Sequence, residues 1–328
     1  MEGLEIMENN FWKNKKILIT GYEGFLGSHL TKTLLCLGAK LWGLDIKVYR
    51  KQTILSTQDL NKVRVIKGRV ENFPLVSRII NKNKIEFIFH LAAQSLVGPA
   101  LNNPIKTFTT NICGTWNVLE ASRHNKLVKA IIIASSDKAY GIQNKLPYKE
   151  TSPIAGCHPY DVSKSCADLL AFTYFHTFNL PICITRCGNI FGPGDFNFSR
   201  IIPDAIRSII KNKTLVIRSD GKFTRDYIYI KDIISGYLLL ARKMISLKLY
   251  GEAFNFSNES PISVLELVKI ISKISGQNKP DYKITNQAKY EIKYQFLSSL
   301  KARKILGWKP VYTLENGLKE TIKWYQNY

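Results

Sequence analysis

The stretch Gly21-Tyr-Glu-Gly24-Phe-Leu-Gly27 decides the fold of this 328-residue chain. It follows an apolar run, Lys16–Thr20, and opens a segment of helical periodicity, Phe25–Leu37. In that context Gly21 permits a tight turn, Gly24 lets the backbone approach a pyrophosphate, and Gly27 lets the helix pack closely on the strand. The helix N-terminus then faces the phosphates. The motif therefore predicts a dinucleotide-binding strand–turn–helix unit.

Apolar runs alternate with amphipathic segments through the first half of the chain. This alternation predicts an α/β fold, a Rossmann-type doubly wound parallel sheet. The expected strands are Lys16–Thr20, Leu41–Leu44, Val63–Ile66, Phe87–His90, Ala130–Ala134 and Ile182–Thr185, and the expected helices are Phe25–Leu37, Phe108–Ala121 and Tyr160–Phe178. Glycine and proline at 188–194 break the pattern. We expect an NAD-binding Rossmann domain over 1–186, with a returning segment near 226–257, and a smaller C-terminal α/β substrate lobe over 187–328.

Composition narrows the class of protein. Apolar residues make up 45% of the chain, which excludes a disordered protein. No apolar run approaches the roughly 18 residues that a membrane span needs, so we expect no membrane contact. Residues 1–10 carry acids and no apolar signal core, and we expect a cytoplasmic protein. The six cysteines form no C-x-x-C pair and the five histidines show no ligand spacing, which indicates free thiols and no metal site.

The net charge of +22 raises the question of nucleic-acid binding. The lysines are scattered among isoleucines and asparagines, and no dense basic run with interleaved aromatic residues occurs. We therefore favour compositional bias and an anionic small substrate over nucleic acid.

Asp45 ends the second expected strand. A carboxylate at that place accepts hydrogen bonds from both ribose hydroxyls, which favours NAD over NADP. The alternative is a plain strand-end residue without a ligand. Lys47 and Arg50 lie close in sequence and would soften the preference for NAD.

Two further motifs carry catalytic side chains. In Tyr160-Asp-Val-Ser-Lys164 the two end residues are four apart and share one helix face. An ammonium beside a phenol favours the phenolate, which makes the tyrosine a usable base near neutral pH. In Ser135-Ser136-Asp137-Lys138-Ala139-Tyr140-Gly141, which follows the fifth strand, the Ser136 hydroxyl would bind a sugar oxygen. The alternatives are an exposed helix pair and a simple Asp137–Lys138 pair in a turn.

These motifs, in this order and spacing, resemble the extended short-chain dehydrogenase/reductases over nearly the whole chain. His90-Leu-Ala-Ala-Gln94 resembles the family's fourth-strand motif, and Arg225-Asp-Tyr-Ile-Tyr229 resembles its pyrophosphate-binding motif. The resemblance implies an NAD site and a nucleotide-sugar site. The implied NAD-binding residues are Gly21, Gly24, Phe25, Leu26, Gly27, Asp45, Arg69, Val70, Leu91, Ala92, Ala93, Asn111, Tyr160 and Lys164, and the implied substrate-binding residues are Gln94, Asn189, Arg200 and Arg225.

Within the family the chain is most similar to the CDP-glucose 4,6-dehydratases. Ser136-Asp137-Lys138 and Arg186-Cys-Gly-Asn189-Ile-Phe-Gly192-Pro-Gly-Asp195 carry this similarity, which favours a CDP-sugar. Two positions depart from the pattern. Arg69 stands where the family usually has an adenine-contacting aspartate, and we expect Arg69 to stack on the ring instead. Leu26 follows Phe25 where the CDP-glucose enzymes carry lysine.

The mechanism that this resemblance implies is internal redox. Tyr160 takes the sugar 4-hydroxyl proton as hydride leaves C4, a base removes the C5 proton, water departs, and hydride returns to C6. We assign the acid to Asp137 and the C5 base to Lys138. The alternatives are a 4-epimerase or decarboxylase, which needs no Asp-Lys pair, and a non-catalytic NAD-sensing or nucleic-acid-binding protein of the same fold. Apolar excess on helices 108–121 and 160–178 predicts a homodimer.

Overall fold

The computed structural model describes residues 10–277, 279–288 and 291–328. The acidic N-terminal residues considered above lie, up to residue 9, outside the described residues. The chain divides into two compact units. The first comprises the chain up to Gly141, Pro153–Arg186 and Ile234–Phe254, and the second comprises Ile142–Ser152, Cys187–Ile233 and Asn255–Tyr328.

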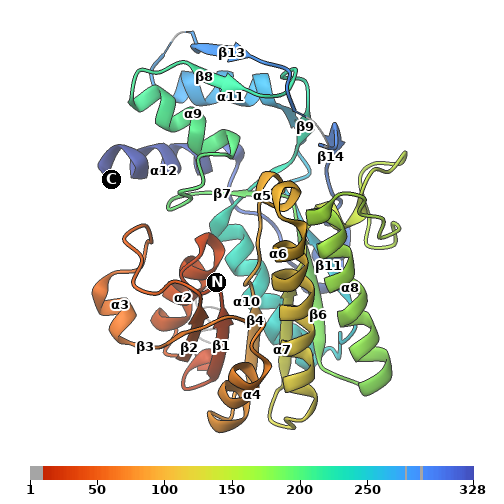
Figure 1. Ribbon diagram of the computed structural model, residues 1–328. Helices are drawn as coiled ribbons and strands as arrows, with labels where there is room; N and C mark the ends of the chain where they lie inside the picture. The colour runs from red at the N-terminus through yellow and green to blue at the C-terminus, as the bar shows by residue number, and fades with distance from the viewer. Residues whose placement is uncertain (1–9, 278, 289–290) are drawn as a thin grey trace. The chain divides into compact units, whose positions relative to one another are not determined.

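A seven-stranded sheet forms the centre of the first unit among the described residues (Figure 1). Its order is β11-β6-β5-β4-β1-β2-β3, and β1 to β6 pair in parallel. The strands are β1 (Lys16–Thr20), β2 (Lys40–Asp45), β3 (Val63–Lys67), β4 (Phe87–His90), β5 (Ala130–Ala134), β6 (Ile182–Cys187) and β11 (Ala253–Phe256). The order reverses between β1 and β4, which is the place where open α/β sheets bind ligands. The predicted doubly wound α/β fold is confirmed.

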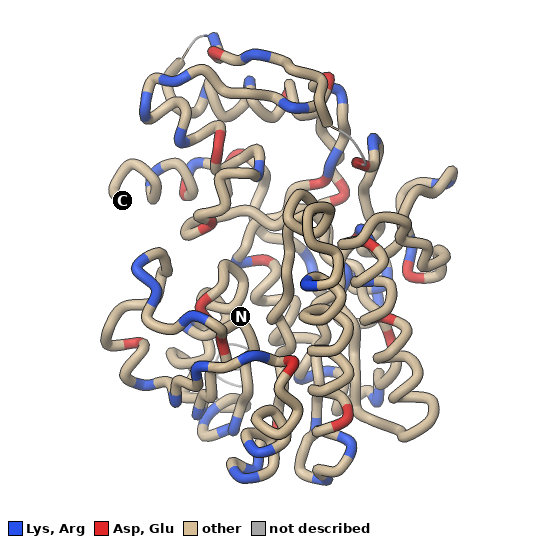
Figure 2. Tube along the Cα trace, viewed as in Figure 1, with Lys and Arg blue, Asp and Glu red and all other residues tan. Residues whose placement is uncertain are grey.

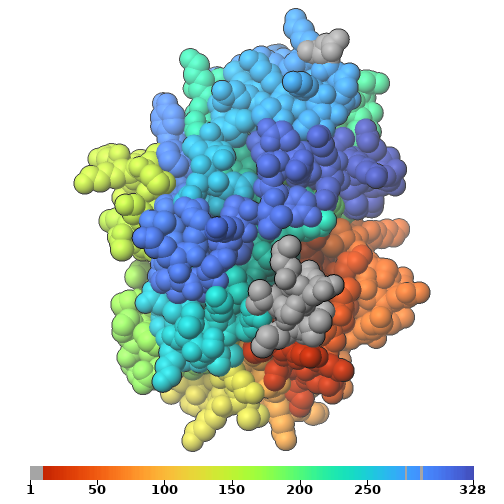
Figure 3. Space-filling view, turned by 180° about the vertical axis from the view of Figure 1, so that it is seen from behind, coloured from red at the N-terminus to blue at the C-terminus, as the bar shows by residue number. Residues whose placement is uncertain are grey.

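Successive side chains of each strand point to opposite faces of the sheet, and each face packs against its own set of helices. One face carries Leu18, Ile88 and Ile131, and α4, α7 and α8 cover it with Ile80, Leu119 and Ala171 among others. The opposite face packs against α2 and α10, where the Thr185 hydroxyl hydrogen-bonds to Tyr237 at 2.6 Å. Figure 3 views this second side, with α10 in teal beside N-terminal residues in red. Because both faces are buried, the strands are apolar throughout rather than alternating.

The helices begin and end at ordinary capping signals. Ser56 and Ser263 form capping boxes with Asp59 and Glu266, and Gly24 precedes the first turn of α2 without a side-chain cap. The helices of the first unit are α2 (Phe25–Cys36), α3 (Thr57–Asn61), α4 (Phe73–Lys82), α5 (Val97–Asn102), α6 (Pro104–Phe108), a π-helical turn η1 (Thr109–Cys113), α7 (Gly114–Arg123), a 3₁₀ helix η2 (Asp137–Tyr140) and α8 (Pro159–Phe178). Helix α10 (Ile230–Ser246) contributes to both units.

The helix expected over Phe108–Ala121 differs from the one observed. Helical structure begins at Pro104, capped by the side chain of Asn103, and a π turn at Thr109–Cys113 interrupts it before α7. A π turn inserts one residue and re-aims the side chains around it. Apolar periodicity does not reveal such an insertion, because the pattern on either side of it remains helical.

The second unit combines short sheets with further helices. Its described helices are α9 (Ile201–Ile210), α11 (Val264–Ile274), the π turn η3 (Ala302–Leu306) and α12 (Leu314–Asn327). Its described strands are β7 (Asn189–Phe191), β8 (Leu215–Ile217), β9 (Thr224–Arg225), β10 (Tyr227–Tyr229), β12 (Ile262–Ser263), β13 (Tyr282–Ile284) and β14 (Tyr294–Gln295). They pair as β10-β7, β12-β9-β14 and β13-β8.

Charge is spread widely over the molecule. Figure 2 shows Lys and Arg along the trace of both units rather than gathered on one segment. None of the helices in the described part of the chain is long and apolar enough to cross a membrane.

Candidate active site

The glycine motif forms the turn between β1 and α2. Gly21 has a left-handed backbone (φ +73°), and a Cβ there would come within 3.0 Å of the backbone of Ala92. A Cβ on Gly27 would lie 2.0 Å from the carbonyl oxygen of Gly21. Only glycine fits either place. The first turn of α2, which contains Phe25 and Leu26, has no acidic residue and no side-chain cap, so its backbone N–H groups are available to an anion.

A hydrogen-bonded path connects the glycine loop to β4. The Thr20 hydroxyl accepts from Leu91 N and Ala92 N, both at 3.1 Å, and contacts His90 Nδ1 at 2.8 Å. With both acceptor sites of the hydroxyl used, its proton must go to His90, so Nδ1 accepts and Nε2–H donates to Thr115 Oγ1 (3.1 Å). Thr115 in turn donates to the carbonyl oxygen of Asn111 at 2.6 Å. Burial, together with the charge of Lys164, lowers the pKa of His90 to about 3.

Asn111 continues this path to helix α8. Its amide donates to the Gln94 carbonyl and to Ser163 Oγ, each at 2.9 Å, and its Oδ1 accepts from Gln94 N at 2.7 Å. Ser163 donates to the Tyr160 carbonyl at 2.7 Å. The Gln94 side chain folds back on Leu96. The π turn thus places Asn111 so that it fixes both the loop after β4, which includes Ala93, and the start of α8.

The catalytic candidates follow β5 and face α8. Ser136 caps η2, and its hydroxyl donates to Asp137 Oδ1 at 2.9 Å while it accepts from Lys138 N at 3.3 Å. Asp137 is 4% exposed and Tyr160 is 8% exposed. Lys164 Nζ donates to the Ala134 carbonyl at 2.7 Å, which anchors the ammonium at the carboxyl end of β5. The described contacts therefore hold Ser136, Asp137 and Lys164 around the end of one strand.

A buried ion pair supports the segment that carries Ser136–Lys138. Asp168 of α8 accepts from Arg186 Nε at 2.9 Å and Nη2 at 2.7 Å, and also from the hydroxyl of Ser135. Arg186 Nη1 donates to Tyr140 OH at 2.9 Å, with the guanidinium 4.9 Å from the ring centroid. The charge of Asp168 raises the pKa of Arg186 against the opposing effect of burial. No sequence motif predicted Asp168, although a charged residue on the buried face of a helix is a signal that could have indicated it.

Asp161 is a second buried acid for which no sequence motif predicted a role. It is 3% exposed, and burial raises the pKa of its carboxyl against the opposing charge of Lys138. Ligand atoms of Cys157, His158 and Asp161 lie within 4.8 Å of one another. The cationic Lys138 and the positive end of α8 disfavour a cation there, so we propose no metal site.

Asp45 ends β2 and is almost fully buried. Its Oδ1 accepts from Arg50 Nη2 at 2.5 Å. Arg69 is exposed and lies 3.3 Å from Glu71, whereas Val70 is buried and packs under Gly114. Whether Arg69 stacks on adenine stays a prediction.

The remaining candidates lie in the second unit. Asn189 N donates to the Asp226 carbonyl at 2.9 Å, next to the β7–β10 pair. Arg200 precedes α9 and pairs with Asp195 at 3.0 Å. Arg225 is 7% exposed, and its Nη1 donates to the carbonyls of Thr224 (2.9 Å) and Lys293 (3.0 Å). These guanidinium groups are the phosphate-binding candidates of this unit.

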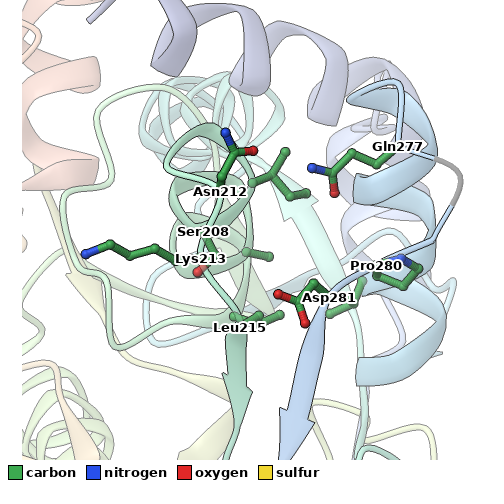
Figure 4. A pocket seen from close by; sticks show the side chains of 10 residues that line it. Ser208, Asn212, Lys213, Leu215, Gln277, Pro280 and Asp281 are labelled. Carbon is green, nitrogen blue, oxygen red and sulfur yellow. The ribbon is translucent and has the colours of Figure 1, made fainter.

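A small cavity of about 170 Å³ lies elsewhere in the second unit (Figure 4). Its lining comes from α9, β8, α11 and neighbouring loops, and includes Ser208, Asn212 and Asp281. None of the candidate site residues lines it.

Comparisons with known proteins identify the family of this chain. The family described as "GDP-mannose 4,6 dehydratase" matches residues 18–321. A CDP-glucose 4,6-dehydratase of Salmonella typhimurium is 29% identical over 98% of this chain and 93% of its own length. The crystal structure of a dTDP-glucose 4,6-dehydratase from Bacillus anthracis in complex with NAD has a TM-score of 0.86 at 28% identity, covering 95% of this chain and 97% of that one.

An epimerase is similar to the same degree. A Thermotoga maritima UDP-glucose 4-epimerase, solved with UDP-glucose, has a TM-score of 0.85 at 27% identity, covering 95% of this chain and 99% of that chain. Similarity of the whole chain therefore does not separate dehydratase from epimerase. The family match, which spans nearly the whole chain, establishes that this protein is a member of the NAD-dependent epimerase/dehydratase family of extended short-chain dehydrogenase/reductases.

Proposed function

We propose that this protein is a nucleotide-sugar 4,6-dehydratase that forms a 4-keto-6-deoxy sugar, and that its substrate is a CDP-sugar. The observation that carries the dehydratase assignment is the buried Asp137, hydrogen-bonded to Ser136 at the end of β5. An epimerase needs the Ser136, Tyr160 and Lys164 set alone, whereas elimination of water needs an acid beside it. The similarity to the Salmonella enzyme supports the cytidine base.

The first unit fits NAD. The glycine turn has no room for a Cβ, the start of α2 is uncapped, and Asp45 Oδ2 is buried without a hydrogen-bond partner among the described residues. Gly21, Gly24 and Gly27 would admit the pyrophosphate, and Asp45 would accept from the ribose hydroxyls. When bound, NAD supplies the acceptor for the C4 hydride and the donor that returns it to C6.

The protein's own side chains would handle the protons. Tyr160 removes the proton of the 4-hydroxyl, with the Lys164 ammonium stabilising the phenolate. Ser136 holds the same sugar oxygen. Asp137 protonates the departing 6-hydroxyl while Lys138 takes the C5 proton, and Lys138 returns a proton to C5 when hydride adds to C6. Ser136, Asp137 and Lys138 follow the carboxyl end of β5, and Lys164 donates to the Ala134 carbonyl at that end, which is where ligands of such sheets bind.

In the second unit, Asn189, Arg200 and Arg225 would bind the nucleotide diphosphate, because phosphates are held best by charge-assisted donors. We also propose that the protein works in the cytoplasm. All six cysteines are free thiols, which suits a reducing compartment.

A substrate panel tests the proposal. The protein is incubated with CDP-, GDP-, UDP- and dTDP-glucose, and product mass is read for each, with Tyr160→Phe as the inactive control. We expect one product that is one water lighter, formed fastest from the CDP-sugar. An isomeric product of unchanged mass would replace the dehydratase assignment with that of an epimerase.

A further inference from the structure

Two buried polar atoms just after and at the end of β2 have no hydrogen-bond partner in the part of the chain that the structure describes. Asp45 Oδ1 accepts from Arg50 Nη2 at 2.5 Å and from Lys47 N at 3.2 Å. Asp45 Oδ2 and Arg50 Nε, although shielded from water, have no hydrogen-bond partner among the described residues. Buried donors and acceptors are almost always paired in folded proteins. An orphan acceptor and an orphan donor in one ion pair therefore indicate a ligand with hydroxyl groups.

Arg50 reaches Asp45 because Glu23, a residue of the glycine motif, holds the backbone of Tyr49 and Arg50 in place. Glu23 is 2% exposed, and its carboxylate accepts from Tyr49 N at 2.8 Å and Arg50 N at 2.7 Å, one on each oxygen. Tyr22 OH donates to the same carboxylate. Tyr49 has a left-handed backbone (φ +57°), which turns the chain back toward β2. The guanidinium is thus a fixed part of the ribose end of the proposed NAD site.

We propose that Arg50 determines the selectivity of this protein for NAD over NADP. Its guanidinium could bind the 2′-phosphate of NADP, but the ion pair with Asp45 keeps it from doing so. A guanidinium binds carboxylate and phosphate with the same planar donor arrangement. To bind NADP, the native protein would have to release Arg50 from Asp45 and leave a buried carboxylate uncompensated beside the phosphate. Selectivity for NAD would then have two sources. The Asp45 carboxylate and the 2′-phosphate of NADP compete for the Arg50 guanidinium, and Asp45 also repels the phosphate. The inference rests on the proposed NAD site.

Dissociation constants for NAD⁺ and NADP⁺, measured by calorimetry without any sugar, test this. The proteins are the native chain, Asp45→Ser, Asp45→Ser/Arg50→Met, and Lys51→Met, which removes an exposed neighbouring charge. We expect Asp45→Ser to tighten NADP⁺ binding by about tenfold or more, since a charge-assisted pair is gained. Adding Arg50→Met should abolish that gain, and Lys51→Met should leave the ratio of the two constants at the native value.

Two results would overturn the inference. One is an Asp45→Ser protein that binds NADP⁺ no better than the native chain does. The other is a gain that survives in the double variant, which would assign the phosphate to another cation. Asp45→Asn, which keeps the side-chain volume, replaces Asp45→Ser if that protein does not fold. Native protein that binds neither cofactor would contradict the proposed function itself, whereas native NAD⁺ binding with unresponsive variants contradicts only the role of Arg50.

Discussion

At the scale of single residues, Asp137 distinguishes a dehydratase from an epimerase, because only the dehydratase needs an acid to protonate the departing 6-hydroxyl. We predict that Asp137→Asn still oxidises the sugar at C4 but loses water about 10²–10⁴-fold more slowly, the usual contribution of a positioned acid. The amide is nearly the same size and keeps an oxygen to accept from Ser136. Stopped-flow absorbance of reduced nicotinamide, followed together with product mass, separates the two steps.

Two further variants, measured in the same way, test the other steps of the reaction. Tyr160→Phe should prevent the first hydride transfer, and Lys138→Met should stall after oxidation if Lys138 is the C5 base. Elimination at the native rate in Asp137→Asn would show that another group is the acid. Asp161, the buried carboxyl whose pKa is raised, would then be the first to examine.

His90 predicts a pH dependence of stability. Because its pKa falls from 6.5 to about 3 on folding, the unfolded chain binds one more proton than the folded chain between those values. Stability contributed by the neutral ring is present above pH 6.5 and is lost as the pH falls, by about 2 kcal/mol between pH 8 and pH 5. Denaturant titrations of His90→Asn should lack this component, whereas the exposed His124→Gln should retain it. An identical pH slope in native protein and His90→Asn would contradict the buried, neutral ring.

At the scale of elements, the turn between β1 and α2 is the most constrained. Gly27→Ala would place a methyl group 2.0 Å from the Gly21 carbonyl, so α2 must move away from the loop. We expect a loss of stability on the order of 1–3 kcal/mol and weaker NAD⁺ binding. Gly98→Ala in α5, where nothing lies within 4 Å, serves as the control and should be neutral or stabilising. Equal thermal stability of the two variants would rule out the close packing described here.

The same elements show what sequence can and cannot supply. Strands such as Lys16–Thr20 and Ala130–Ala134 were predictable to the residue, because both faces of the sheet are buried and the apolar runs end where the sheet ends. The π turn at Asn111 was not, because one inserted residue leaves the apolar period intact. Glu23 accepts hydrogen bonds from Tyr49 N and Arg50 N, which are 26 and 27 positions further along the chain. No local sequence pattern predicts a contact over that separation.

Some residues of the candidate site could be predicted from the sequence and others could not. Motif spacing predicted roles for Ser136, Tyr160 and Lys164, but for none of the groups that fix their surroundings. Thr20, Thr115 and Asp168 are polar residues in buried elements, and their roles appear only once strands and helices are packed together.

At the scale of the whole molecule, we predict a homodimer through α7 and α8. Trp116, Leu169 and Phe172 are 44%, 56% and 53% exposed on these two neighbouring helices, and a second copy of the chain would cover them. Sedimentation at micromolar concentration should give a dimer, and Leu169→Lys/Phe172→Glu should give a folded monomer. Leu247→Lys, which changes a leucine that is 49% exposed elsewhere, should leave the dimer intact. A monomeric native protein would refute the prediction.

The measurement that tests the central claim most directly uses a nucleotide sugar carrying deuterium at C4, with the base that the substrate panel selects. The account predicts a product that is one water lighter and keeps the deuterium, now at C6, because hydride leaves and returns within one bound molecule. A product that keeps its water, loses carbon dioxide, or releases the deuterium to solvent would contradict a 4,6-dehydratase that works by internal hydride transfer.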